Sequence, residues 1–263
     1  MIEKSSAPGS KPSQTHSGRA DPGGVSFSNA ILGHISPTVT AVLVDAAFFL
    51  KRARLIFGRL TPQEAAQRLH RVALDHLNGA RNQRVARLHR IFVYDAPPVA
   101  WKGHRPISKT PVDLLQSPTA RWRSDFHRAL IGQRKVALRL GEVPAAHIHW
   151  QLKQEALKAL ANGRRSWESI TDDDFQLELR QEGVDMRLGL DIASLAYQGH
   201  VNQIVLISGD ADFVPAAKLA RRQGIDFVLD PMWANIRPDL YEHIDGLRTV
   251  VPRPGGSGAN GDG

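Results

Sequence analysis

Four aspartates in this sequence stand where their carboxylates could bind a metal ion. Asp45 ends one apolar run, Asp210 and Asp212 follow another, and Asp185 begins a segment with helical spacing. The ends of buried strands are where an open α/β sheet presents ligands to a crevice. Asp210 and Asp212 are one residue apart and repel each other unless a cation lies between them. The four aspartates therefore predict a catalytic centre built around a divalent metal ion.

A divalent ion at such a site suits the hydrolysis of a phosphodiester bond. It makes a bound water nucleophilic at neutral pH and neutralises charge on the phosphoryl oxygens. Mg²⁺ takes carboxylate ligands and keeps several waters. Without the ion, the four carboxylates raise one another's proton affinity, so we expect a raised pKa for at least one of them.

Asp191 is a fifth aspartate of this region, six residues after Asp185 on the same predicted helix. Six residues advance a helix by about 600°, which leaves the two side chains roughly 120° out of line. Only one of them can therefore face the ion directly. We favour Asp185, which stands at the helix start, and expect Asp191 either to support the site from behind or to have a structural role.

Helix capping is the alternative role for two of these aspartates. Asp45 and Asp212 each precede a helical segment, where a carboxylate caps the free N–H groups. A capping carboxylate can still offer an oxygen to a metal-bound water, so the two roles are compatible. We expect the triplet Asp172–Asp174 to be a solvated acidic turn. A phosphatase that uses Asp45 as its nucleophile ranks last, because position 47 is Ala and not a second Asp.

The aspartates are positioned by strands and helices that alternate along the chain. We expect strands at Thr38–Asp45, Leu88–Tyr94, Val136–Leu140, Phe175–Arg180, Ile204–Ile207 and Asp226–Leu229, and helices at Ala46–Phe57, Thr61–Leu77, Thr119–Ile131, Leu152–Leu160, Gly183–Ala196 and Asp212–Gln223. This order favours an α/β fold with a doubly wound, mostly parallel sheet. We expect one domain at 37–250 with an insertion at about 99–150 after the second strand, between disordered tails at 1–36 and 251–263 that are rich in Gly, Ser and Pro.

The composition indicates an intracellular protein that binds a polyanion. The 263 residues carry a formal net charge of +8 and a pI near 10.1, which favour a nucleic-acid partner. The chain has no cysteine, which suits a reducing compartment. No apolar run approaches the ~20 residues of a membrane span, and the N-terminus lacks the apolar core of a secretory signal. We therefore expect a cytoplasmic location and no contact with membranes.

Several motifs together resemble a known family. They are Asp45, Tyr94–Pro97, Gly183–Asp185 with Asp191, and Ser208–Phe213 with Pro215. Over about residues 40–230 the chain is similar to the NYN domain family of the PIN-like nuclease superfamily, in particular its LabA-like branch. The resemblance implies a Rossmann-like fold in which Asp45, Asp185, Asp210 and Asp212 hold Mg²⁺ or Mn²⁺ and cleave RNA. The expected activity is that of a metal-dependent endoribonuclease.

One position departs from the family pattern. The family often has Asn three residues after its first Asp, whereas this chain has Phe48. The alternative function is therefore an RNA-binding or regulatory module of the same fold that cleaves weakly or not at all. Cleavage of single-stranded RNA that needs the metal and is lost in Asp210→Asn would favour the enzyme.

Basic residues beside aromatic ones are the candidates for contact with RNA. An indole stacks on an unpaired base while a neighbouring guanidinium meets phosphate, which suits single-stranded RNA. The candidates are Arg121, Trp122, Arg123, Lys102 and Arg105. Trp122 could instead belong to the core of an amphipathic helix, and a homo-oligomer is left open.

Overall fold

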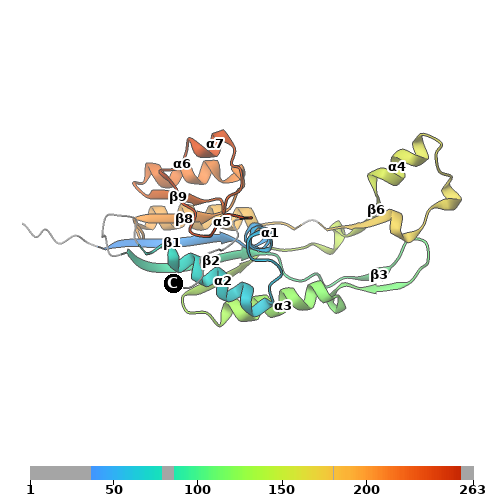
Figure 1. Ribbon diagram of the computed structural model, residues 1–263, viewed down its shortest axis with the longest axis horizontal. Coiled ribbons are helices and arrows are strands. Elements are labelled where there is room, and N and C mark those ends of the chain that lie inside the picture. Colours follow the sequence, from blue (N-terminus) through green and yellow to red (C-terminus); the bar gives the residue numbers. More distant parts are fainter. Residues whose placement is uncertain (1–36, 79–85, 180, 256–263) are drawn as a thin grey trace, which may run out of the picture. The chain divides into compact units, whose positions relative to one another are not determined.

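A six-stranded sheet forms the centre of the fold. The computed structural model describes residues 37–78, 86–179 and 181–255. The strand order is β10-β9-β8-β1-β2-β5, and every pair in this sheet is parallel. The strands are β1 (Thr38–Asp45), β2 (Ala86–Asp95), β5 (Val136–Leu140), β8 (Gln203–Ile207), β9 (Asp226–Asp230) and β10 (Gly246–Leu247). The sheet confirms the predicted α/β class, and Figure 1 shows its strands side by side.

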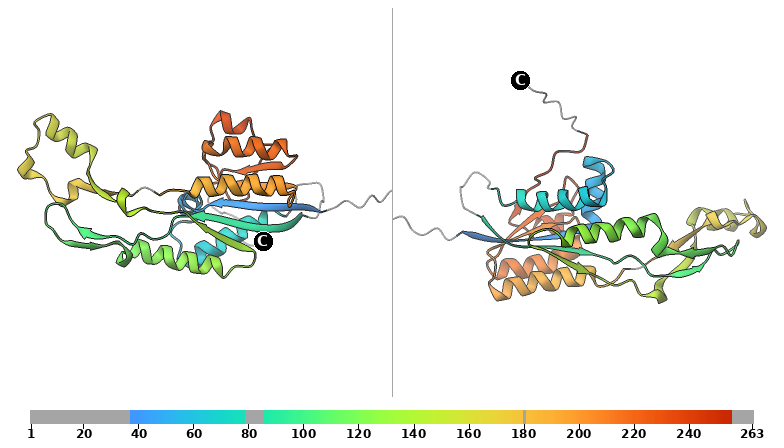
Figure 2. Two further views of the ribbon diagram at one scale, coloured as in Figure 1. Left: turned by 180° about the vertical axis from the view of Figure 1, so that it is seen from behind. Right: turned by 90° about the horizontal axis from the view of Figure 1, so that it is seen from below.

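Helices cover both faces of this sheet, as Figure 2 shows from two sides. One face packs against α5 (Val184–Gln198) and α6 (Val214–Arg222), and the other against α1 (Ala46–Phe57), α2 (Pro62–Asp75) and α3 (Pro118–Ile131). A short helix, α7 (Pro238–Tyr241), follows β9. Successive strand residues point to opposite faces. Along β1, Ala41 and Leu43 therefore enter the core beneath α5 and α6, while Val42 and Val44 enter the other core.

The first two helices begin where the sequence predicts. The Asp45 carboxylate caps α1, accepting the Phe48 N–H at 3.0 Å. Thr61 and Glu64 form a complete capping box at the start of α2, and Pro62 occupies its first turn. This helix ends at Asp75, slightly before the predicted end.

The insertion predicted at 99–150 is wrong in its bounds, because α3 and β5 belong to the central layers. Helix α3 packs against α2, and β5 pairs with β2. The chain instead makes two excursions from the sheet, at 96–117 and 141–183. The first contains the hairpin of β3 (Lys102–His104) and β4 (Pro111–Asp113). The second contains the hairpin of β6 (His149–Leu152) and β7 (Phe175–Glu178), with α4 (Gln154–Ala161) between its strands.

Both excursions leave the sheet at the carboxyl ends of its strands (Figure 1). They also contact each other. The indole Nε1 of Trp150 donates to the His104 carbonyl at 2.8 Å, and the Trp101 and Trp150 rings meet edge to face. The Asp172 carboxylate accepts the Ile107 N–H at 2.9 Å. These contacts hold the two hairpins together.

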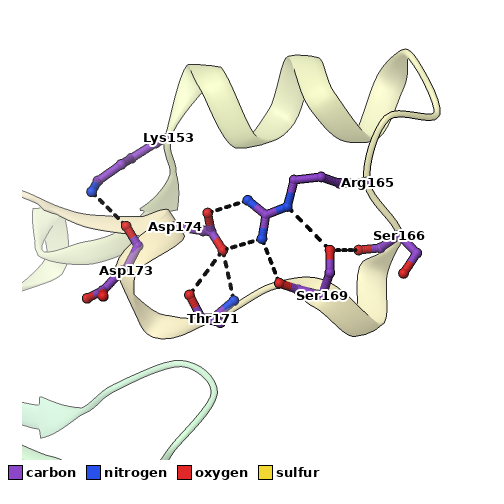
Figure 3. Close-up of polar contacts among 7 residues, drawn as sticks. All are labelled: Lys153, Arg165, Ser166, Ser169, Thr171, Asp173 and Asp174. Carbon is purple, nitrogen blue, oxygen red and sulfur yellow. Dashed lines mark hydrogen bonds and ion pairs between the residues drawn. The ribbon is translucent and has the colours of Figure 1, made fainter.

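The predicted acidic turn lies between α4 and β7 in the second excursion (Figure 3). Arg165 pairs with both carboxylate oxygens of Asp174, at 2.6 and 2.9 Å. This guanidinium and the N–H of Thr171 hold the pKa of Asp174 well below its usual range. Lys153 donates to the Asp173 carbonyl. The triplet Asp172–Asp174 thus forms a turn that contacts with Arg165, Thr171 and Lys153 stabilise.

The two predicted tails lie wholly or partly outside the described residues. The tail at 1–36 lies outside them entirely, and so do the last eight residues of the tail at 251–263. Among the helices of the described ranges, none is long and apolar enough to cross a membrane.

Candidate active site at the carboxyl edge of the sheet

Asp45 lies at the carboxyl end of the central strand β1. Strand alternation directs its side chain to the face covered by α5, since Leu43 two residues earlier lies in that core. The side chain is half-buried and caps α1. Burial raises the pKa of Asp45, and the nearby carboxylates of Asp185 and Asp95 raise it further, against the N–H groups of Phe48 and Ala47, which lower it. The capping role is therefore real, and it coexists with close carboxylate neighbours.

Asp185 lies in the first turn of α5. Gly183 precedes this helix with φ +76°, a left-handed conformation that glycine adopts without strain. The Asp185 side chain is exposed. Desolvation and the negative charges of Asp210 and Asp212 together raise its pKa. The helix N-terminus alone would favour the ionised form, so desolvation and, after it, the repulsion from Asp210 and Asp212 outweigh the helix.

Asp210 and Asp212 lie in the loop after β8, the strand that pairs with β1. Val44 stands beside Ile207, so this loop emerges next to Asp45. Asp210 accepts the Asp212 N–H at 3.0 Å and donates its own N–H to the Ser208 hydroxyl at 3.3 Å. The cap predicted for Asp212 thus falls on Asp210, because a 3₁₀ turn at Ala211–Phe213 precedes α6. Both side chains are exposed.

The charge of Asp185 thus acts on Asp45, and the charges of Asp210 and Asp212 act on Asp185. Across the described part of the chain, none of the four forms an ion pair with a basic side chain. Two of the four have a raised pKa, as expected for carboxylates without a neutralising cation. This uncompensated negative charge distinguishes them from the paired aspartates nearby.

The residues fit a hydrated metal ion better than an enclosed one. Over residues 37–78, 86–179 and 181–255, no three acidic, His or Cys side chains are grouped closely enough to hold an ion together. Mg²⁺ commonly binds through one or two carboxylates, several waters and the phosphates of the substrate. Carboxylate oxygens on an open edge match that donor set.

Phe48 occupies the position where the family often has Asn. Its ring lies against Gly209, within the loop that carries Asp210. The ring is half-buried and also packs against the core beneath α1 and α2. Phe48 thus joins the start of α1 to the Asp210 loop by apolar contact.

Asp191 has a different set of contacts. It accepts the Tyr94 hydroxyl at 2.8 Å and pairs with Arg139 Nε at 3.2 Å. Burial and the Asp191 charge raise the pKa of Tyr94. These bonds tie α5 to β2 and β5, which is the structural role considered for Asp191. Its ion pair with Arg139 is consistent with an Asp191 side chain that does not face the ion.

Asp95, a buried residue at the end of β2, was not among the site residues predicted from the sequence. Asp95 is 3% exposed and binds Arg123 Nη1 through both carboxylate oxygens at 2.7 Å. It also binds His127 Nε2 at 2.7 Å and lies near enough to Asp45 to raise the pKa of that carboxyl. Arg123 and His127 stand four residues apart on α3, a spacing that places them on one helix face. That spacing, with Asp95 at a strand end, was the available signal.

The residues predicted to contact RNA differ in their burial and in their partners. Trp122 packs half-buried against the core beside Phe126, and its Nε1 donates to the Leu60 carbonyl, so the core alternative describes it better. Arg123 is engaged by Asp95. Arg121 is exposed and bonds to Gln116. Lys102 and Arg105 belong to the first excursion, where Lys102 pairs with Asp113 at 3.2 Å.

Comparison with known proteins identifies the second half of this fold. A family model described as NYN domain matches residues 142–235. This part of the chain is similar to an NYN domain. The match includes Asp185, Asp210 and Asp212 with α5, β8, α6 and β9, whereas Asp45 and β1 lie before it. NYN domains belong to the PIN-like nuclease superfamily, which agrees with the parallel sheet and with the predicted family.

Other comparisons add little to the NYN assignment. A solved structure of a protein of unknown function from Vibrio parahaemolyticus is 14% identical, with a TM-score of 0.42. That similarity covers 81% of this chain and 93% of the other. No curated protein matches the sequence significantly.

Proposed function

We propose that this chain is a metal-dependent endoribonuclease of the LabA-like NYN branch, which hydrolyses phosphodiester bonds of single-stranded RNA with Mg²⁺ or Mn²⁺. The observation that carries the proposal is that Asp45 and the loop of Asp210 and Asp212 follow the paired strands β1 and β8 at the carboxyl edge of the sheet, with Asp185 in the first turn of α5. Ion pairs compensate other aspartates of the described chain, such as Asp95, Asp174 and Asp191, but not these four.

Each carboxylate has a separate task in this proposal. Asp45 and Asp185 would hold the ion, and Asp210 and Asp212, in the loop after β8, would bind its waters. When bound, the ion would supply a nucleophilic water and charge neutralisation on the phosphoryl oxygens. The half-buried position of Asp45 keeps its carboxylate in one orientation, since it is fixed by the Phe48 N–H. The exposed Asp210 and Asp212 leave room for the substrate phosphate.

A basic cavity beside α1 offers a path for the RNA strand. It has a volume of about 960 Å³, and its wall includes Lys51, Arg54, Arg59 and the side of Trp122. The same wall includes Ala47, two residues from Asp45. Basic side chains beside an apolar floor suit a single strand, whose phosphates and bases both need partners. In this proposal Trp122 forms part of the cavity wall and does not have the stacking role predicted from the sequence.

Single-substitution variants test the catalytic centre. The purified chain should cleave single-stranded RNA only when Mg²⁺ or Mn²⁺ is present. Asp45→Asn, Asp185→Asn and Asp210→Asn should each reduce cleavage by at least ~100-fold while the protein stays folded. Asp173→Asn is the matched control, because Asp173 is an exposed aspartate of the distant acidic turn. Metal-independent cleavage, or full activity of Asp185→Asn, would refute the proposal.

The basic path is tested by the salt dependence of RNA binding. Each phosphate contact contributes about −0.7 to the slope of log affinity against log salt for a single strand. Lys51→Ala with Arg54→Ala should flatten the slope by roughly 1 to 1.5 units. The control pair is Lys158→Ala with Arg164→Ala, two exposed basic residues of the second excursion. A slope that changes only in the control pair would place the RNA elsewhere.

The second candidate is a regulatory RNA-binding module of the same fold. Phe48 favours it, because an apolar ring stands against the Asp210 loop where the family often has an amide. Binding of RNA without cleavage under both metals, unchanged by Asp185→Asn, would support the module over the enzyme.

A further inference from the structure

A second cavity lies between the sheet edge and the two excursions. It has a volume of about 490 Å³, within the range of sites that bury a small-molecule-sized group. Its walls come from the segment after β2, from the start of α3 and from β7 of the second excursion. Most of the lining is apolar, with Pro98, Val99, Leu114, Ala120 and Leu177 among its residues.

An ion pair forms part of the polar lining of this cavity, which also includes Ser117, Thr119 and Gln181. Asp95 and Arg123 both line it, and their paired contact at 2.7 Å fixes the guanidinium in place. His127 holds the other side of Asp95. Arg123 remains about one quarter exposed, with 28% of its side chain accessible, so it can still meet a ligand. An apolar chamber with one fixed polar edge is the arrangement that orients a flat heteroaromatic ring.

The cavity adjoins the four aspartates. Ala47 lines it and stands between Asp45 and Phe48 at the start of α1. Asp95, at its wall, directly follows Tyr94, which stands beside Asp45 in the paired strands β1 and β2. If the phosphate of a nucleotide lies at the aspartates, the base next to that phosphate can therefore reach this cavity.

We propose that this cavity binds one unpaired nucleobase of the RNA, next to the phosphate that is cleaved. The proposal deepens the proposed function and rests on it. The base would pack against the proline and leucine walls and direct its polar edge to Arg123 and Asp95. A phosphate suits the chamber poorly, because the buried Asp95 carboxylate and the apolar walls disfavour an anion. A paired base cannot enter, so the cavity selects single strands.

RNA oligonucleotides that lack one base provide the probe. Each nucleotide around the cleaved bond is replaced in turn by an abasic one, and both binding and cleavage are measured on the full chain. We expect one position at which loss of the base weakens binding about 10-fold, with little effect at the others. Stacking platforms tolerate every base, so exchange of one base for another should matter less than its removal.

Thr119→Trp fills the mouth of the cavity from an exposed position of α3. In this variant the abasic and intact oligonucleotides should bind equally. Ser194→Trp is the matched control, a tryptophan at an exposed position of α5 that does not line the cavity. It should keep the full 10-fold difference. Leu114→Ala, which removes an apolar wall, should reduce the difference without blocking the site.

The possible outcomes separate this inference from the proposed function. Cleavage without any base-dependent position would overturn the cavity assignment and leave the nuclease. A base-dependent position that Thr119→Trp removes, with no cleavage under either metal, would leave the cavity assignment and overturn the nuclease. A base-dependent position unchanged by Thr119→Trp places the base elsewhere, and absence of RNA binding overturns both.

Discussion

The ring of Phe48 lies so close to Gly209 that no larger residue fits there unchanged. A β-carbon at position 209 would stand 2.7 Å from Phe48 Cε2. Gly209 separates Ser208, at the end of β8, from Asp210. The contact therefore couples the start of α1, capped by Asp45, to the loop that carries Asp210 and Asp212, which are proposed to bind the waters of the metal ion.

Gly209→Ala should destabilise the protein by about 1–3 kcal/mol, because the added methyl group forces the ring or the loop to move. Phe48→Ala should remove most of this penalty, so the cost of Gly209→Ala should be smaller in the Phe48→Ala background. Urea denaturation of the two single variants and the double variant measures this coupling. Equal costs in both backgrounds would show that the contact does not limit position 209.

Asp45→Asn should raise the stability of the metal-free protein at neutral pH. Burial and the facing carboxylates of Asp185 and Asp95 raise the pKa of Asp45 in the folded state, so the folded protein binds the proton more tightly than the unfolded chain. Stability is then lost as pH rises from the unfolded pKa through the folded pKa. Asn removes this cost and still caps α1.

The gain should vanish at pH values below the unfolded pKa, near 4, where Asp45 is protonated in both states. Denaturation curves of wild type and Asp45→Asn across this pH range measure it, with chelator present throughout. A gain that persists unchanged at low pH would assign the effect to packing and not to charge.

Mg²⁺ or Mn²⁺ should stabilise the wild-type protein, because the ion relieves the repulsion among the four carboxylates. At a metal concentration 100 times its Kd, the gain should be about 2.7 kcal/mol. Asp185→Asn with Asp210→Asn should abolish this gain, whereas Asp173→Asn should keep it. The melting temperature measured against metal concentration gives the result, and equal stabilisation of all three proteins would locate the ion elsewhere.

Tyr94→Phe should separate stability from catalysis. It removes the hydroxyl that donates to Asp191 at 2.8 Å, at a cost of about 1.5 kcal/mol. Arg139 still pairs with Asp191, so α5 keeps its position and RNA cleavage should change by less than about threefold. Asp185→Asn should do the reverse and lose cleavage while the protein stays stable. If Tyr94→Phe is fully folded but loses metal-dependent cleavage, Asp191 has a direct part in the site.

Local features of the fold follow from the sequence because their causes are local. Thr61, Pro62 and Glu64 determine the start of α2 through contacts within four residues. The apolar run before Asp45 forms β1 with the predicted bounds, and α1 follows at once. Helical spacing alone separates Asp185 from Asp191, and the structure gives these two aspartates different partners.

Only the tertiary structure decided which segments join the sheet and which basic residues are free. β5 pairs with β2 across more than 40 residues of sequence, so the predicted insertion divides into two excursions. Trp122 packs into the core, and the guanidinium of Arg123 is bound by Asp95, which stands 28 residues earlier. A sequence pattern reports periodicity and charge over a few turns, whereas burial and ion pairing depend on which distant element packs alongside.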